Sequence, residues 1–137
     1  MAFRGLFAKL SPWAAITIGG CAVLFVVDAW RELGATSFPL IRGTLPNLVA
    51  VPTLTFGFLM FRFPERRPSD PMCAASQDRL FWFLWLGSFL ATVAWEFSQL
   101  WGALLFDPLD LVATGVGAIA TVIAFMSLRR FSFLPSS

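Results

Sequence analysis

Three acidic residues, Asp28, Glu96 and Asp110, lie within or at the ends of long apolar stretches of the chain. A carboxyl group in hydrocarbon costs about 3 kcal/mol unless it is paired, hydrated or protonated. Clustered carboxylates accept hydrogen bonds and attract cations, and Ca²⁺ and Mg²⁺ take oxygen ligands. These residues therefore indicate a site for a cation, a proton or a group rich in hydrogen-bond donors.

Other chemistry has little support in the sequence. The chain contains no His, and Cys21 and Cys73 are its only cysteines, so a zinc site is not expected. The acidic residues match no established metal-binding loop, and no serine has a base nearby in the sequence. We predict no catalytic residue, no metal ligand set and no cofactor, and an enzyme is the least favoured class.

The elements that must position the acidic residues are membrane-spanning helices. The chain has 137 residues, of which 58% are hydrophobic and 13% charged, with a mean hydropathy of +0.76. A soluble domain needs about twice that share of charge, so the apolar surface must face lipid. We predict an all-α membrane protein, a single transmembrane domain over residues 1–137 that forms a four-helix bundle. The expected spans, each near the roughly 20 residues that cross a bilayer, are 12–30, 44–60, 80–105 and 108–128.

Local signals refine this prediction. Phe3, Leu6, Phe7 and Leu10 follow helical spacing, which indicates a short N-terminal helix lying on the membrane interface. Ser11-Pro12 is a typical cap and first turn of the first span. Pro52 is expected to kink the second span. The polar stretch 64–78 is expected to be a connector.

The basic residues predict the orientation, because Lys and Arg prefer the cytoplasmic side. If the chain crosses four times, only Arg31 and Arg42 fall on the outer side. Both termini are therefore expected in the cytoplasm. The residues on the inner side are Arg4, Lys9, Arg62, Arg66, Arg67, Arg79, Arg129 and Arg130.

Polar residues recur at helical spacing on three spans, and we expect these stripes to face each other inside the bundle. With a rise of 1.5 Å per residue, Asp28, Glu96 and Asp110 lie roughly 22 to 28 Å from the inner boundary. We therefore predict an outward-facing polar pocket, with Arg42 as the charge partner of Glu96 and Asn47 as a further hydrogen-bond partner. The stripes are Thr17, Cys21 and Asp28; Ser88, Thr92, Glu96 and Gln99; and Asp107, Asp110, Thr114, Gly117 and Thr121.

A purely structural interpretation remains open for several of these residues. Asp107, Pro108 and Asp110 have the pattern of a helix N-cap, first residue and third-position acid. Asp28 comes just before Arg31 and Glu32, so it can simply mark the exit of the first span into water. Glu96 is the hardest to explain by packing alone.

The third and fourth spans resemble a known family. The run Trp95-Glu96-Phe97-Ser98-Gln99-Leu100, the run from Phe106 to Thr114 and the pair Gly117-Ala118 are similar to the VanZ-like family of small bacterial membrane proteins. Some members of that family are associated with glycopeptide (teicoplanin) resistance. The resemblance implies that Glu96, Gln99, Asp110 and Gly117 are site residues. Thr114 stands where the family commonly has Asn, and the family's Arg between the Gln and the Asp is missing here.

Two functions follow as hypotheses. The first is a VanZ-like protein of the bacterial inner membrane whose outward-facing pocket binds a polar or cationic group of a lipid or a cell-envelope precursor. Membrane lipids are then its partners, and nucleic acid is not, because a net charge of +2 is small and the basic residues are dispersed. The alternative is an accessory subunit of a larger membrane complex, and an ion carrier is a third possibility. The ligand-binding residues expected under the first hypothesis are Asp28, Arg42, Glu96, Gln99, Asp110 and Thr114.

Overall fold

The computed structural model describes residues 11–33, 39–63, 71–99 and 107–131, except for the side chains of residues 39–43 and 131. These ranges hold four α-helices and no strand, and each helix is long and apolar enough to cross a membrane. The predicted all-α four-helix membrane fold is therefore confirmed. The short helix predicted near the N-terminus lies outside the described residues. The helices are α2 (Pro12–Glu32), α3 (Pro39–Arg62), α4 (Pro71–Ser98) and α5 (Pro108–Phe131).

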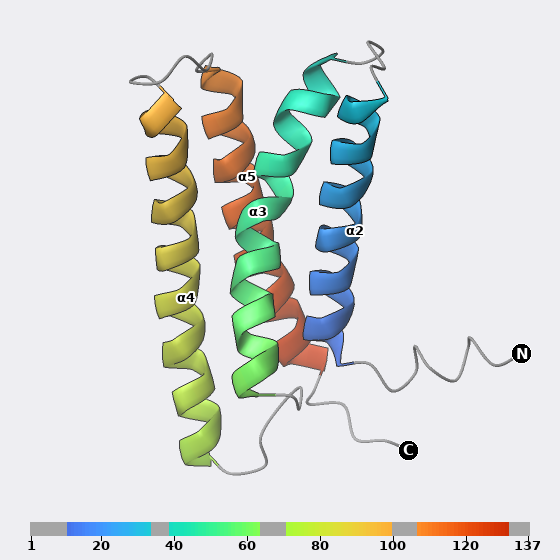
Figure 1. Ribbon diagram of the computed structural model, residues 1–137. Helices are drawn as coiled ribbons and strands as arrows, with labels where there is room; N and C mark the ends of the chain where they lie inside the picture. Colours follow the sequence, from blue (N-terminus) through green and yellow to red (C-terminus); the bar gives the residue numbers. More distant parts are fainter. Residues whose placement is uncertain (1–10, 34–38, 64–70, 100–106, 132–137) are drawn as a thin grey trace, which may run out of the picture.

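Helix α3 is the centre of the bundle. It packs against α2, α4 and α5, and α4 also packs against α5. Successive helices run in opposite directions, and α2 and α4 lie on opposite sides of α3 (Figure 1). We call the end where α2 and α4 finish and α5 begins the acidic end, which is at the top of Figure 1. The opposite end is called the aromatic end.

Capping residues explain where two of the helices begin. The Ser11 hydroxyl accepts a hydrogen bond from the Ala14 backbone N–H at 3.3 Å, and Pro12 is the first helical residue of α2. The Asp107 carboxylate likewise accepts from the Leu109 N–H at 2.9 Å, directly before Pro108 opens α5. A cap side chain satisfies backbone donors that the first turn leaves unpaired. Both caps were predicted from the sequence and are confirmed.

Helix α3 contains two prolines, Pro46 and Pro52. Each removes a backbone hydrogen bond and pushes the preceding turn away. Figure 1 shows the corresponding bend, with the first half of α3 leaning towards α2 and the second half running beside α4.

A cluster of stacked rings closes the aromatic end. Phe81 of α4 stacks on Phe125 of α5 with ring centroids 3.6 Å apart. Trp13 of α2 stacks on Phe56 of α3 at 5.3 Å and on Phe125 at 5.9 Å. All four side chains are at most 1% exposed. The two Trp13 pairs are offset or tilted, a geometry that adds stabilisation beyond the buried area.

Small residues bring the helices close together further along the bundle. Gly117 of α5 lies against the backbone of Leu48 of α3, so closely that a Cβ atom on Gly117 would overlap the Leu48 carbonyl oxygen. The Trp85 indole Nε1 of α4 donates a hydrogen bond to the Ala118 carbonyl oxygen of α5 at 2.9 Å. Close approach at small residues and side chain to backbone bonds are the usual means of helix association in lipid.

Outside the aromatic core, several polar side chains are buried and many large apolar side chains are exposed. Thr55, Thr114 and Thr121 are fully buried, whereas Phe25 and Phe83 each expose 75% of their surface. The Thr114 and Thr121 hydroxyls donate to carbonyl oxygens of their own helix, and the exposed apolar groups face the hydrocarbon. The polar stripe of the third span is buried as predicted, with Ser88, Thr92 and Glu96 inside.

Three predictions about the spans need correction. Helix α4 begins at Pro71, well inside the stretch predicted to be a connector, and ends at Ser98, before the predicted end at residue 105. Helix α3 begins at Pro39, five residues before the predicted start. The polar stripe of α2 does not face inward, since Cys21 and Asp28 are exposed. The buried residues of α2 are instead Trp13, Ala14 and Val27.

Candidate functional site

Glu96 lies in the last turn of α4 and is 1% exposed. Its Oε2 atom accepts a hydrogen bond from the Gln99 amide Nε2 at 2.9 Å. The span predicted from the sequence continues for nine residues after Glu96, but α4 ends only two residues later, at Ser98. Glu96 is therefore at the acidic end of the bundle, within reach of polar groups from neighbouring helices.

Asp110 lies in the first turn of α5, at the acidic end. Its backbone carbonyl accepts a hydrogen bond from the Thr114 hydroxyl at 2.9 Å, and its Oδ1 atom is buried with no hydrogen-bond partner among the described residues. The positive end of the helix dipole favours a negative charge at this position. Asp110 therefore keeps unused acceptor capacity at the acidic end.

Asn47 of α3 connects the two carboxyl groups. Its side-chain amide is a hydrogen-bond partner of both Glu96 and Asp110. The carboxyl groups are also close enough to repel each other, and Asp107 adds to the repulsion on both. Arg31 of α2 acts in the opposite sense, through its attraction to Asp110. All four helices thus contribute a polar side chain to one cluster.

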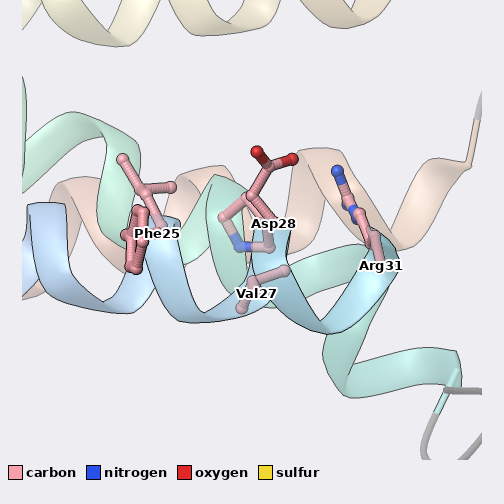
Figure 2. A pocket seen from close by; sticks show the side chains of 6 residues that line it. Phe25, Val27, Asp28 and Arg31 are labelled. Carbon is pink, nitrogen blue, oxygen red and sulfur yellow. The ribbon is translucent and has the colours of Figure 1, made fainter. Parts of the chain in front are cut away.

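A cavity of about 330 Å³ lies beside this cluster, with Asp28 and Arg31 among its lining residues. Figure 2 shows the Asp28 carboxylate and the Arg31 guanidinium extending to the same side of α2, into the same space. They are three residues apart, so they share one face of the helix. Leu24, Val27 and Pro46 complete an apolar wall around the two charged groups.

The predicted site residues have different positions in the structure. It brings Glu96, Gln99 and Asp110 together and places Asp28 on the adjacent cavity. The Thr114 side chain is fully buried, and its hydroxyl hydrogen is engaged by its own helix, so it supports the first turn of α5 rather than facing a ligand. The side chain of Arg42 lies outside the described residues.

Sequence reasoning gave too little weight to two residues. Arg31 was counted only as a charge on the outer side, although its spacing of three residues from Asp28 was a usable signal. Asn47 was named only as a further partner, but it touches both carboxyl groups. An amide inside an otherwise apolar span is as informative as an acid, because it too requires hydrogen-bond partners in lipid.

The chemistry of the cluster is that of a receptor for donors and cations. Carboxylates and amide oxygens accept hydrogen bonds, and the Arg31 guanidinium offers five N–H donors. Within the described ranges, no three His, Cys, Asp or Glu residues are arranged to hold a metal ion. The arrangement suits an organic cation such as an ammonium group, and the Arg31 guanidinium, which also attracts Asp110, has enough N–H donors to bind an anionic group beside it.

A scan against protein-family models, a search of curated proteins and a search of solved structures each found no match to this chain. The resemblance to the VanZ-like family therefore stays a prediction from the residues. The interpretation of the site depends on its own geometry.

Proposed function

We propose that this chain is a VanZ-like membrane protein whose acidic end binds the cationic group of a lipid or of a cell-envelope precursor. The observation that carries the proposal is the meeting of Glu96 and Asp110, from different helices, on the single amide of Asn47. Packing alone does not require two acids at one point in an apolar bundle, because each acid adds an unfavourable desolvation energy. A bound cation offsets the repulsion between them.

Asp28 and Arg31 supply the exposed part of the site. Glu96 is buried, so it acts on a ligand through its field and through Asn47 and Gln99, whereas Asp28 is exposed and lines the cavity. An ammonium group in this cavity meets a carboxylate directly. Electrostatic attraction of this kind is strengthened by the low-dielectric surroundings of the bundle.

Head-group selectivity tests the proposal. The purified protein in a neutral detergent is mixed with equal amounts of phosphatidylethanolamine and phosphatidylglycerol of identical acyl chains, and bound lipid is counted by native mass spectrometry. Phosphatidylethanolamine carries an ammonium group and phosphatidylglycerol does not. We expect about a tenfold preference for phosphatidylethanolamine, equivalent to about 1.4 kcal/mol.

Two variants serve as test and control in this experiment. Asp28→Asn, at an exposed position, is expected to remove most of the preference without disturbing the fold. Asp78→Asn removes a carboxylate on α4 far from the acidic end and is expected to leave the preference intact. Equal binding of the two lipids by the unmodified protein would refute the proposal.

The same proposal places the protein in the bacterial inner membrane, with both termini in the cytoplasm. Cys73 lies in the first turn of α4, at the end of the bundle opposite the acidic end, and is partly exposed. A membrane-impermeant maleimide should label Cys73 only after the membrane is permeabilised. Labelling of intact cells at Cys73 would reverse the assigned orientation.

A further inference from the structure

A groove runs along the bundle from the charged cavity towards the aromatic end, between α2 and α4 and over α3. Three cavities of about 320 to 340 Å³ follow one another along it. The first and second share Leu24 and Pro46, and the second and third share Leu54 and Ala91. Shared lining residues show that the three cavities are neighbouring parts of one groove.

The length of the groove corresponds to one membrane leaflet. It extends along α3 from Pro46 to Phe58 and along α4 from Trp95 to Phe83. Each of these segments corresponds to roughly 18 Å at a rise of 1.5 Å per residue. One leaflet contributes about half of a hydrocarbon core that is roughly 30 Å thick. A single acyl chain from the leaflet at the acidic end therefore fits the groove along its length.

The lining changes from charged to apolar along this path. The cavity at the acidic end has Asp28 and Arg31, and the middle cavity has Asn47 and Thr92 among apolar neighbours. In the third cavity Ser88 is the one polar lining residue. Small residues leave room for a chain, namely Ala50, Gly87 and Ala91.

The charged end of the groove is complementary to a zwitterionic head group. An aminophospholipid carries a phosphate and, a few atoms away, an ammonium group. Arg31 suits the phosphate, because a guanidinium binds phosphate oxygens through paired N–H donors. Asp28 on the same face of α2 suits the ammonium group (Figure 2). A head group that is only anionic would be repelled by the nearby carboxylates.

From these observations we infer that the groove binds one acyl chain of an aminophospholipid, whose phosphate lies at Arg31 and whose ammonium group lies at Asp28. The inference rests on the proposed function and specifies its ligand. Asn47 lines the groove and is a hydrogen-bond partner of the Glu96 and Asp110 carboxyl groups, so the occupied groove and the acidic cluster form one site.

Fluorescence quenching by brominated acyl chains tests the position of the chain. Trp95 lines the middle of the groove, and its contribution is isolated by comparison with Trp95→Phe. The protein is reconstituted in phosphatidylglycerol vesicles that contain a small fraction of either brominated phosphatidylethanolamine or brominated phosphatidylglycerol. We expect the brominated phosphatidylethanolamine to quench Trp95 about tenfold more effectively at low fractions, from the same preference as above.

Two variants of α4 separate groove binding from general contact with lipid. Ala91→Phe fills the groove where the second and third cavities meet, and it should remove the difference between the two lipids. Ala94→Phe places the same bulk at an exposed position on α4 that lines none of the three cavities, and it should keep the difference. If Ala91→Phe fails to fold, Gly87→Leu provides the test instead, because Gly87 lines the third cavity and a Cβ atom there meets nothing within 4 Å, and it should likewise remove the difference.

The outcomes distinguish this inference from the proposed function. Equal quenching of Trp95 by the two lipids, combined with preferential binding of phosphatidylethanolamine in native mass spectrometry, would refute the groove and leave the head-group site intact. If the unmodified protein shows no preference for phosphatidylethanolamine in mass spectrometry, both the groove and the proposed head-group site are refuted. A difference in quenching that Ala91→Phe leaves unchanged would place the chain outside the groove.

Discussion

Replacement of Gly117 by alanine should separate α5 from α3. A Cβ atom at this position would overlap the Leu48 carbonyl oxygen and lie 3.0 Å from the Leu48 carbonyl carbon. The obstacle is backbone inside a helix, so no rotamer change relieves it, and the two helices must move apart. Overpacking of this kind costs about 1 to 3 kcal/mol, and a value at or above the upper end is expected against rigid backbone.

The neighbouring Gly115 provides a matched control. A Cβ atom at Gly115 meets nothing within 4 Å, so Gly115→Ala should change the free energy of unfolding by at most about 0.5 kcal/mol. The assay is unfolding of the purified protein by sodium dodecyl sulfate in mixed micelles, followed by circular dichroism. Because Gly117 lies two turns from Asp110, Gly117→Ala should also weaken the preference for phosphatidylethanolamine. Equal stability of the two alanine variants would refute the close contact between α3 and α5.

Four further substitutions are expected to have smaller effects in the same unfolding assay. Gly20→Ala should cost about 1 kcal/mol, because a Cβ atom at Gly20 would overlap the side chain of Thr53 of α3, which can rotate. Gly19→Ala should cost almost nothing, because a Cβ atom there meets nothing within 4 Å. Equal effects of the two substitutions would contradict the packing of α2. Trp85→Phe should cost about 0.5 to 1 kcal/mol through loss of the indole hydrogen bond between α4 and α5, and an unchanged stability would show that this bond contributes nothing. Asp78→Asn should cost less than about 1 kcal/mol, because its 3.0 Å ion pair with Arg129 is partly exposed, and the cost should vanish at high salt.

The fold was predictable because hydrocarbon imposes simple rules on sequence. A span needs about 20 apolar residues, and four such stretches are present. The inward faces of α4 and α5 were also predictable, since Thr92, Glu96 and Thr114 had no other way to avoid lipid. The caps at Ser11 and Asp107 could be read directly, because their residue types and the following prolines leave few other roles.

The errors have equally definite causes. Hydropathy detects contact with lipid rather than helical conformation, so it missed the polar first turns of α4, where Asp78 and Arg79 lie. A helix of 28 residues is about 42 Å long and extends beyond the hydrocarbon. Hydropathy also counted the apolar residues after Ser98 as part of the third span, although α4 ends at Ser98.

The orientation of α2 could not be derived from its own sequence. Its polar residues suggested an inward face, but α2 packs mainly on α3 and turns Trp13, Ala14 and Val27 towards it. Asp28 is consequently left on the groove rather than beside Glu96 and Asp110. Which basic residue lies beside Asp110 also depends on how α2 is rotated about its own axis, and this is why Arg31 was not recognised as the partner of Asp110.

The most direct test of the site is a distance between the lipid head group and the protein. Phosphatidylethanolamine with a ¹⁵N-labelled ammonium group is reconstituted with protein carrying ¹³C-labelled aspartate, and solid-state NMR measures the dipolar coupling between the nitrogen and the carboxyl carbons. The account predicts a coupling that corresponds to ion-pair contact and that disappears in Asp28→Asn but persists in Asp78→Asn. A coupling that survives Asp28→Asn, or the absence of any coupling, would contradict the account.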